Sequence, residues 1–226
     1  MSINFFKRIL TSLLLSAVLL FCLFLNSFLM LYLIIIASII SFYEFNILVK
    51  KIFKNNKKNY FLSNIVSFIF TCFFIFSGYY FLENDIFKLF YVILICVFSD
   101  TGGYFIGKLI GGKKLTKISP KKTISGSLGS FLFSIFPLFI LWEFFRNINY
   151  DLVLGNIEKN LLTLIFISLF LSLVCQLGDL LISYFKRLAK VKDTGTLLPG
   201  HGGLLDRIDG LIFVIPVAFI LDKIFY

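Results

Sequence analysis

Residues 161–182 read LLTLIFISLFLSLVCQLGDLLI, an apolar run in which Asp179 is the only charged residue. A helix of about 20 mostly apolar residues is long enough to cross the hydrocarbon core of a bilayer. The run lacks the strict alternation of apolar and polar residues that is typical of a strand in a transmembrane barrel. The stretch therefore predicts a membrane-spanning helix that carries a carboxylate near its end.

The rest of the chain repeats this pattern. Hydrophobic residues make up 59% of the 226 residues and charged residues only 15%, whereas soluble domains are nearer half apolar and a quarter charged. We expect seven spans, at residues 9–25, 27–49, 61–82, 86–108, 124–145, 161–182 and 208–225. The predicted fold class is thus an all-α, polytopic integral membrane protein.

The first predicted span, residues 9–25, follows Lys7 and Arg8 and so resembles a signal peptide. No small-x-small cleavage site is obvious after it, and we interpret it as a retained anchor. Together with the second span it forms a predicted N-terminal helical pair, residues 1–58. Residues 59–226 are then the predicted catalytic membrane domain.

The basic residues predict the orientation of the spans. With a cytoplasmic N-terminus, most of the 22 Lys and Arg residues fall on the inner side, in the N-terminus and in the loops at 50–58, 108–122 and 186–207. The outer side keeps only Lys88, Arg146, Lys159 and Lys223. This asymmetry follows the positive-inside rule and places the C-terminus outside.

Four aspartates lie at the cytoplasmic ends of the predicted spans: Asp100, Asp179, Asp206 and Asp209. Ionisable groups at membrane depth are costly and usually face a cavity or a partner. Asp206 and Asp209 are three residues apart and share one face of a helix. Asp206 could simply cap that helix, but several neighbouring carboxylates also suit a magnesium ion, which prefers oxygen ligands.

Lysines crowd the same side, mixed with hydroxyls, glycines and acids. The segment ISPKKTISG holds Ser119, Lys121, Lys122 and Thr123, and SYFKRLAKVKD holds Lys186, Arg187, Lys190, Lys192 and Asp193. Lysines beside metal-binding carboxylates are typical of a site for a nucleotide triphosphate or a phospholipid headgroup. The lysines at 50–58 lack this context, and we interpret them as positive-inside charge alone.

The segment GGYFIGKL contains G-x-x-x-x-G-K, but Leu109 stands where a P-loop needs Ser or Thr. Gly103, Gly107 and Gly111 instead have the G-x-x-x-G spacing that lets helices approach closely, so we expect helix packing here. His201 is the only histidine, which excludes a histidine cluster for zinc. It is either an ordinary polar loop residue or a substrate contact.

Residues 183–209 read SYFKRLAKVKDTGTLLPGHGGLLDRID. This stretch resembles the signature of the phosphatidate cytidylyltransferases, or CDP-diacylglycerol synthases, at every constrained position. The segments SDTGGYFIGKLIGGKK, ISPKKTISGSLG and QLGD are similar to the family's S-D-x-x-A-Y, S-P-K-K-T-x-E-G and Q-x-G-D segments. The resemblance runs from about Ser99 to the C-terminus, with Gly103 for the usual Ala and Ser125 for the usual Glu.

The resemblance implies a transferase that converts CTP and phosphatidate to CDP-diacylglycerol and pyrophosphate in phospholipid biosynthesis. It implies Mg²⁺, with room for a second cation such as K⁺, and a homodimer without nucleic acid. The implied place is a bacterial-type inner membrane, with the active site at the cytoplasmic face. Alternatives are a cytidylyltransferase for another lipid phosphate, or a membrane transporter.

The resemblance also assigns roles to residues. The implied metal ligands are Asp179 and Asp206, and the implied catalytic residues are Asp100, Lys121, Lys122, Asp193 and Asp209. The implied substrate-binding residues are Ser119, Thr123, Lys186, Arg187, Lys192, His201 and Arg207. Ser125 is left out of the expected site because the family's Glu is missing there.

Overall fold

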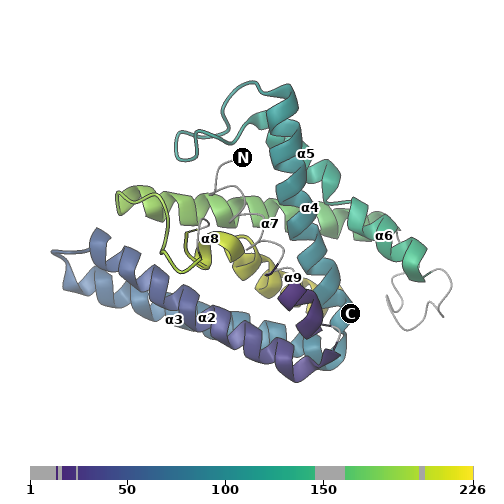
Figure 1. Ribbon diagram of the computed structural model, residues 1–226, viewed down its shortest axis with the longest axis horizontal. Coiled ribbons are helices and arrows are strands. Elements are labelled where there is room, and N and C mark those ends of the chain that lie inside the picture. The colour runs from purple at the N-terminus through teal and green to yellow at the C-terminus, as the bar shows by residue number, and fades with distance from the viewer. Residues whose placement is uncertain (1–13, 15–16, 24, 146–160, 199–201, 226) are drawn as a thin grey trace. The chain divides into compact units, whose positions relative to one another are not determined.

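The computed structural model describes the chain except for residues 1–13, 15–16, 24, 146–160, 199–201 and 226 (Figure 1). The described residues form helices and no β-strand, which confirms the all-α class. The helices are α2 (Ser27–Ile52), α3 (Lys57–Asn84), α4 (Ile86–Ile110), α5 (Ile124–Phe133), α6 (Phe136–Phe145), α7 (Leu161–Leu188), α8 (Leu205–Ile208) and α9 (Leu211–Phe225).

Five described helical segments are long and apolar enough to cross a membrane: α2, α3, α4, α7 and residues Ile124–Leu141. They confirm a polytopic membrane protein and match five of the seven predicted spans. Of the predicted span at 9–25, residues 14, 17–23 and 25 are described and are helical, and the others lie outside the described residues. The seven-span count and the orientation stay predictions.

Two predicted spans are interrupted in the structure. The span at 124–145 breaks at Ser134 and Ile135, just before Pro137, because proline has no N–H to continue the helical ladder. The span at 208–225 is interrupted at Asp209 and Gly210, which separate α8 from α9. At 15 residues, α9 is about 22 Å long, which is shorter than the roughly 30 Å hydrocarbon core.

The chain divides into two compact units, one made of residues 1–83 and 182–209, the other of 84–181 and 210–226. Helix α7 passes from the second unit into the first near its C-terminal end. This division follows packing, whereas the predicted boundary at residue 58 follows the order of spans along the chain. The predicted boundary stays a prediction.

The first unit is built on an α2–α3 hairpin (Figure 1). Tyr60 on α3 donates a hydrogen bond to Asn46 on α2 at 2.8 Å, and the rings of Phe42 and Phe68 meet edge to face at 5.9 Å. The end of α7 packs on the same hairpin through Phe185 and Phe45, whose ring centroids are 5.0 Å apart. The segment 182–209 is thereby held against α2.

In the second unit, buried hydroxyls join α4 to α7. Tyr91 hydrogen-bonds Ser168 at 2.6 Å, and Ser99 hydrogen-bonds Ser172 at 2.8 Å. Such pairs satisfy polar groups that would be costly to leave unpaired at membrane depth. They orient the face of α7 that also carries Asp179.

Glycines allow α4 and α5 to pack closely in the second unit. A Cβ at Gly107 would lie only 3.3 Å from the Gly126 Cα, and one at Gly126 would lie 2.7 Å from the Gly103 carbonyl. The predicted packing role is therefore confirmed for Gly103 and Gly107. It is wrong for Gly111, which caps the C-terminus of α4 with a φ of 65° and has no atom near a Cβ position.

Candidate active site

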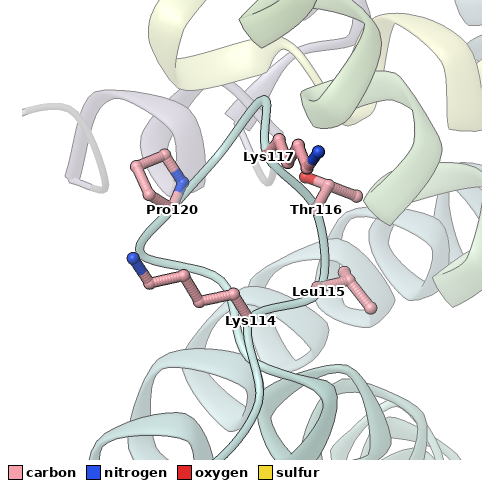
Figure 2. A pocket seen from close by; sticks show the side chains of 5 residues that line it. All are labelled: Lys114, Leu115, Thr116, Lys117 and Pro120. Carbon is pink, nitrogen blue, oxygen red and sulfur yellow. The ribbon is translucent and has the colours of Figure 1, made fainter.

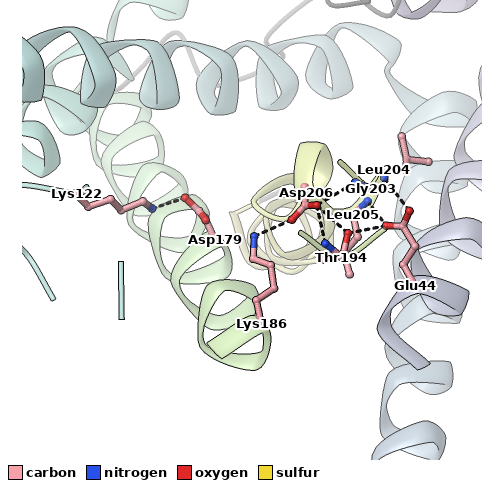
Figure 3. A network of polar contacts seen from close by, with 9 residues as sticks. All are labelled: Glu44, Lys122, Asp179, Lys186, Thr194, Gly203, Leu204, Leu205 and Asp206. Carbon is pink, nitrogen blue, oxygen red and sulfur yellow. Dashed lines mark hydrogen bonds and ion pairs between the residues drawn. The ribbon is translucent and has the colours of Figure 1, made fainter. Parts of the chain in front are cut away.

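Asp206 lies at the centre of a buried hydrogen-bond network in the first unit (Figure 3). Its Oδ1 pairs with Lys186 Nζ at 2.7 Å, and the two side chains are only 6% and 12% exposed. Its Oδ2 accepts hydrogen bonds from the Thr194 N–H at 2.8 Å, the Thr194 hydroxyl at 3.0 Å and the Gly203 N–H at 3.0 Å. Asp206 thus joins α7, the following loop and α8.

The surroundings of Asp206 favour its charged form. Burial acts to raise the pKa of this carboxyl, but the hydrogen bonds from Lys186, Thr194 and Gly203, together with the Lys186 charge, outweigh burial and hold the pKa below its usual value. The N-cap of α8 is Leu204, without a side-chain cap, so the alternative of Asp206 as the N-cap residue is wrong. Asp206 instead accepts bonds from the loop.

The loop that meets Asp206 starts with a defined helix end. Lys190 has a φ of 55°, the Lys190 N–H bonds the Arg187 carbonyl, and the Val191 N–H bonds the Lys186 carbonyl at 3.0 Å. This is the Schellman arrangement that stops a helix and turns the chain. Further on, Leu198 and Gly202 form a bridge that closes the loop before α8.

Glu44 on α2 is a site residue that the sequence analysis missed. Its side chain is buried and accepts hydrogen bonds from the Thr194 hydroxyl at 2.8 Å, the Leu204 N–H at 3.0 Å and the Leu205 N–H at 2.9 Å (Figure 3). A signal was available, because Glu44 is the only charged residue in the predicted span at 27–49. An acid inside a span calls for a partner.

Asp179 on α7 lies in the second unit, where it forms an ion pair with Lys122 (Figure 3). These side chains are more exposed than the Asp206 pair, at 25% and 28%. One turn before Asp179, Gln176 accepts a hydrogen bond from Ser127 at 2.6 Å. Two predicted site residues, Lys122 and Asp179, are thus brought together by the packing of α5 on α7.

Lys122 belongs to a loop that connects α4 to α5. The loop closes on itself through a bridge between Lys114 and Thr123 and a bond from the Leu115 N–H to the Lys122 carbonyl at 2.8 Å. It encloses a pocket of about 380 Å³, lined by Lys114, Leu115, Thr116, Lys117 and Pro120 (Figure 2). The ammonium groups give this pocket a positive charge.

Two hydroxyls of the ISPKKTISG segment, those of Thr123 and Ser125, have local partners. Thr123 is the N-cap of α5 and accepts a bond from the Gly126 N–H at 3.1 Å, so the structure gives it a capping role. Ser125, which stands for the family's usual Glu, donates to the Gly111 carbonyl and lies 3.0 Å from the Thr123 hydroxyl. Ser125 therefore joins the two ends of the loop.

The remaining predicted residues are distributed over both units. In the second unit, Asp100 is exposed and accepts a weak contact from the Cys175 thiol at 3.9 Å, Lys121 is exposed, and Ser119 is half-buried. In the first unit, Arg187, Lys192, Asp193 and Arg207 are exposed, and Asp209 is half-buried at the end of α8. His201 lies outside the described residues.

The donor chemistry of the site suits magnesium at one aspartate better than at the other. Asp179 offers carboxylate oxygens at a partly exposed position. A carboxylate accepts roughly four hydrogen bonds, and Asp206 already has Lys186, two backbone N–H groups and the Thr194 hydroxyl that it shares with Glu44 as partners, so a cation would compete with Lys186 there. Among the described residues no three His, Cys, Asp or Glu side chains are grouped as for a metal. The predicted sharing of one cation by Asp179 and Asp206 stays a prediction.

These features define the class of protein. It is a helical membrane protein with two lysine–aspartate pairs: Lys122 of the loop before α5 with Asp179 on α7, and Lys186 on α7 with Asp206 on α8. The chain belongs to the cytidylyltransferase family, whose model matches residues 45–225. The match includes every described site residue except Glu44.

Individual relatives agree with the family match. Over 133 residues the chain is 46% identical to phosphatidate cytidylyltransferase of Staphylococcus aureus (strain COL), covering 58% of this chain and 47% of the relative. Over 154 residues it is 38% identical to phosphatidate cytidylyltransferase of Bacillus subtilis (strain 168), covering 65% and 54%. The chain thus spans about half the length of the curated relatives it matches.

Proposed function

We propose that the protein is a phosphatidate cytidylyltransferase that makes CDP-diacylglycerol and pyrophosphate from CTP and phosphatidate. The observation that carries the proposal is the signature loop, residues 183–209, which is built around the buried Lys186–Asp206 pair. The names of the relatives support the same activity. The product would enter phospholipid biosynthesis.

The proposed reaction joins two anions. A phosphate oxygen of phosphatidate attacks the α-phosphorus of CTP, the bond from that phosphorus to the oxygen bridging to the β-phosphate breaks, and pyrophosphate leaves with the bonding electrons. The lipid phosphate is itself the nucleophile, so no covalent enzyme intermediate is needed. The protein must bring the reactants together and neutralise their charge.

Basic side chains supply that neutralisation in the proposal. Lys121, Lys122, Arg187 and Arg207 would contact phosphates, with Ser119, Lys192 and His201 as further substrate contacts. Lys186 is paired with Asp206, so it acts on substrate only if that pair opens. Magnesium, when bound, would place positive charge on the pyrophosphate, with Asp179 and Asp206 as the proposed ligands and K⁺ as a second cation.

The chemistry of the substrates fits an enzyme at a membrane surface. The diacyl tails of phosphatidate stay in the bilayer, while CTP arrives from water, so a site at the cytoplasmic end of the spans serves both. From the family resemblance we propose a bacterial-type inner membrane and a homodimer. Asp100, Asp193 and Asp209 are the remaining proposed acidic site residues.

Purified protein in mixed micelles tests the proposal. It should convert radiolabelled CTP to a CDP-lipid when phosphatidate and magnesium are present, as seen by product chromatography. An ether-linked lipid phosphate and an isoprenoid phosphate, supplied in parallel, distinguish the lipid substrate. Turnover of the ether-linked or the isoprenoid phosphate, without turnover of phosphatidate, would indicate the related cytidylyltransferase reaction. If the folded protein turns over none of the three lipid phosphates, the proposed enzyme activity is refuted, and transport assays would then test the alternative class.

A further inference from the structure

Glu44 lies in the C-terminal half of the apolar helix α2, where a buried carboxylate is costly unless it is fully hydrogen-bonded. Its three hydrogen-bond donors all lie in the signature loop, residues 183–209, up to 161 residues away in the chain. Oε1 accepts from the Leu204 N–H, and Oε2 accepts from the Leu205 N–H and the Thr194 hydroxyl. Glu44 therefore accepts hydrogen bonds from backbone N–H groups at the N-terminus of α8, where no side chain of the N-cap residue does so.

The loop leaves room for this carboxylate. A Cβ at Gly195 would lie 2.6 Å from Glu44 Oε1, and one at Gly203 would overlap both the Glu44 carboxylate and the Thr194 hydroxyl. A Cβ at either position would therefore force the Glu44 carboxylate or its neighbours to shift. The missing side chains of the two glycines thus leave the space that the Glu44 carboxylate occupies. Glu44 itself lies just outside the family match, which starts at residue 45.

Thr194 connects Glu44 to Asp206. Its hydroxyl lies 2.8 Å from Glu44 Oε2 and 3.0 Å from Asp206 Oδ2, and its N–H also bonds Asp206. A hydroxyl has one proton, so it can donate to one carboxylate at a time. The position of Thr194, and through it that of Asp206, depends on both carboxylates.

We propose that Glu44 is a positioning residue for the signature loop, a role that rests on the proposed cytidylyltransferase activity. Its carboxylate holds Thr194 and the first turn of α8, and so fixes the geometry of the Lys186–Asp206 pair. Glu44 acts through these groups and does not touch substrate. Charged acceptors make stronger hydrogen bonds than neutral ones, which explains why Glu is used here and not Gln.

The variant Glu44→Gln keeps the size of the side chain but replaces one acceptor oxygen by an NH₂ group that faces donors. We expect kcat to fall by about tenfold to a hundredfold, with a smaller change in the KM for CTP. Amide hydrogen exchange at residues 194–205 of the full-length protein should become at least about tenfold faster. Ser38→Ala is the matched control, because Ser38 is a buried polar residue of α2 that bonds only its own helix in the described network, and it should change neither readout.

A second variant, Thr194→Val, removes the connecting hydroxyl with little change in shape. Because Glu44 acts in part through Thr194, the combined variant should lose less kcat than the product of the two single losses. Independent, multiplying losses would overturn the proposal, as would wild-type kcat or wild-type exchange in Glu44→Gln. If Glu44→Gln does not fold, Thr194→Val alone decides, and normal kcat and exchange in that variant would equally overturn it.

The proposed function can fail separately from this inference. Wild-type protein that gives no CDP-lipid refutes the activity, whereas hydrogen exchange in Glu44→Gln still shows whether Glu44 holds the loop. Active wild-type protein with an unchanged Glu44→Gln variant refutes the positioning role alone.

Discussion

The two lysine–aspartate pairs differ in how deeply they are embedded. Lys186 and Asp206 are 12% and 6% exposed, whereas Lys122 and Asp179 are 28% and 25% exposed. Backbone N–H groups and a hydroxyl also hold Asp206, so its pair is part of the loop's structure. The Asp179 pair lies nearer to solvent and can exchange Lys122 for another cation at lower cost. Asp206 thus organises the loop before α8 in its own unit, and we expect Asp179 in the other unit to respond to ligands.

Asp206→Asn is the strongest test of this comparison. The amide of Asn has one acceptor oxygen in place of two and carries no charge to balance the Lys186 ammonium. Removing one partner of a buried ion pair lowers the free energy of unfolding by about 3–5 kcal/mol. We expect activity to collapse and the Tm in detergent to fall. Adding Lys186→Met should restore part of the Tm but not the activity, since the uncompensated ammonium is removed.

An Asp206→Asn protein with unchanged Tm and unchanged magnesium dependence would contradict both the structural role and the metal assignment. Circular dichroism during heating and CTP turnover measure the two effects on the same preparation.

Asp179→Asn should lose activity about as severely but keep its Tm within the error of measurement. Its carboxylate is partly exposed, and removing it leaves no deeply buried charge behind. We expect the magnesium concentration needed for half-maximal activity to rise, because the amide is a weaker ligand than the carboxylate. A large Tm loss with an unchanged magnesium requirement would mean that Asp179, like Asp206, is chiefly structural.

Lys122→Ala should lower kcat/KM for CTP by about tenfold to a hundredfold, the effect of losing one charge-assisted phosphate contact. The matched control is Lys54→Ala, an exposed lysine of the basic loop at 50–58, which should stay near wild type. Equal losses in both variants would indicate a general effect of surface charge and would remove the distinction between the two regions.

The smallest expected effect is on the pH dependence of stability. The pKa of Asp206 is lowered in the folded protein, so its contribution is present above the ordinary value of 3.8 and is lost as the pH falls through the folded pKa. The Tm difference between wild type and Asp206→Asn should therefore be constant from pH 7 to pH 5. It should shrink only in stronger acid; shrinkage above pH 5 would mean that the pKa is raised.

Much of the site could be recognised from local sequence. The signature at 183–209 contains Lys186 and Asp206, and the segments at 119–125 and 176–179 contain Lys122 and Asp179. The pairing of each lysine with its aspartate could not be predicted from the local sequence. Lys122 and Asp179 meet because α5 packs on α7, where Ser127 also bonds Gln176, and these helices are far apart in the chain.

The sequence by itself determined that this is a helical membrane protein, because runs of about 20 apolar residues have one stable environment. It also determined the family, because the signature residues are adjacent in the chain. Only the tertiary structure decided that Glu44 belongs to the site, since its bond to Thr194 spans 150 residues and depends on how α2 packs beside the loop. Helix formation is governed by near neighbours, whereas the partners of a buried charge are chosen by packing between distant segments.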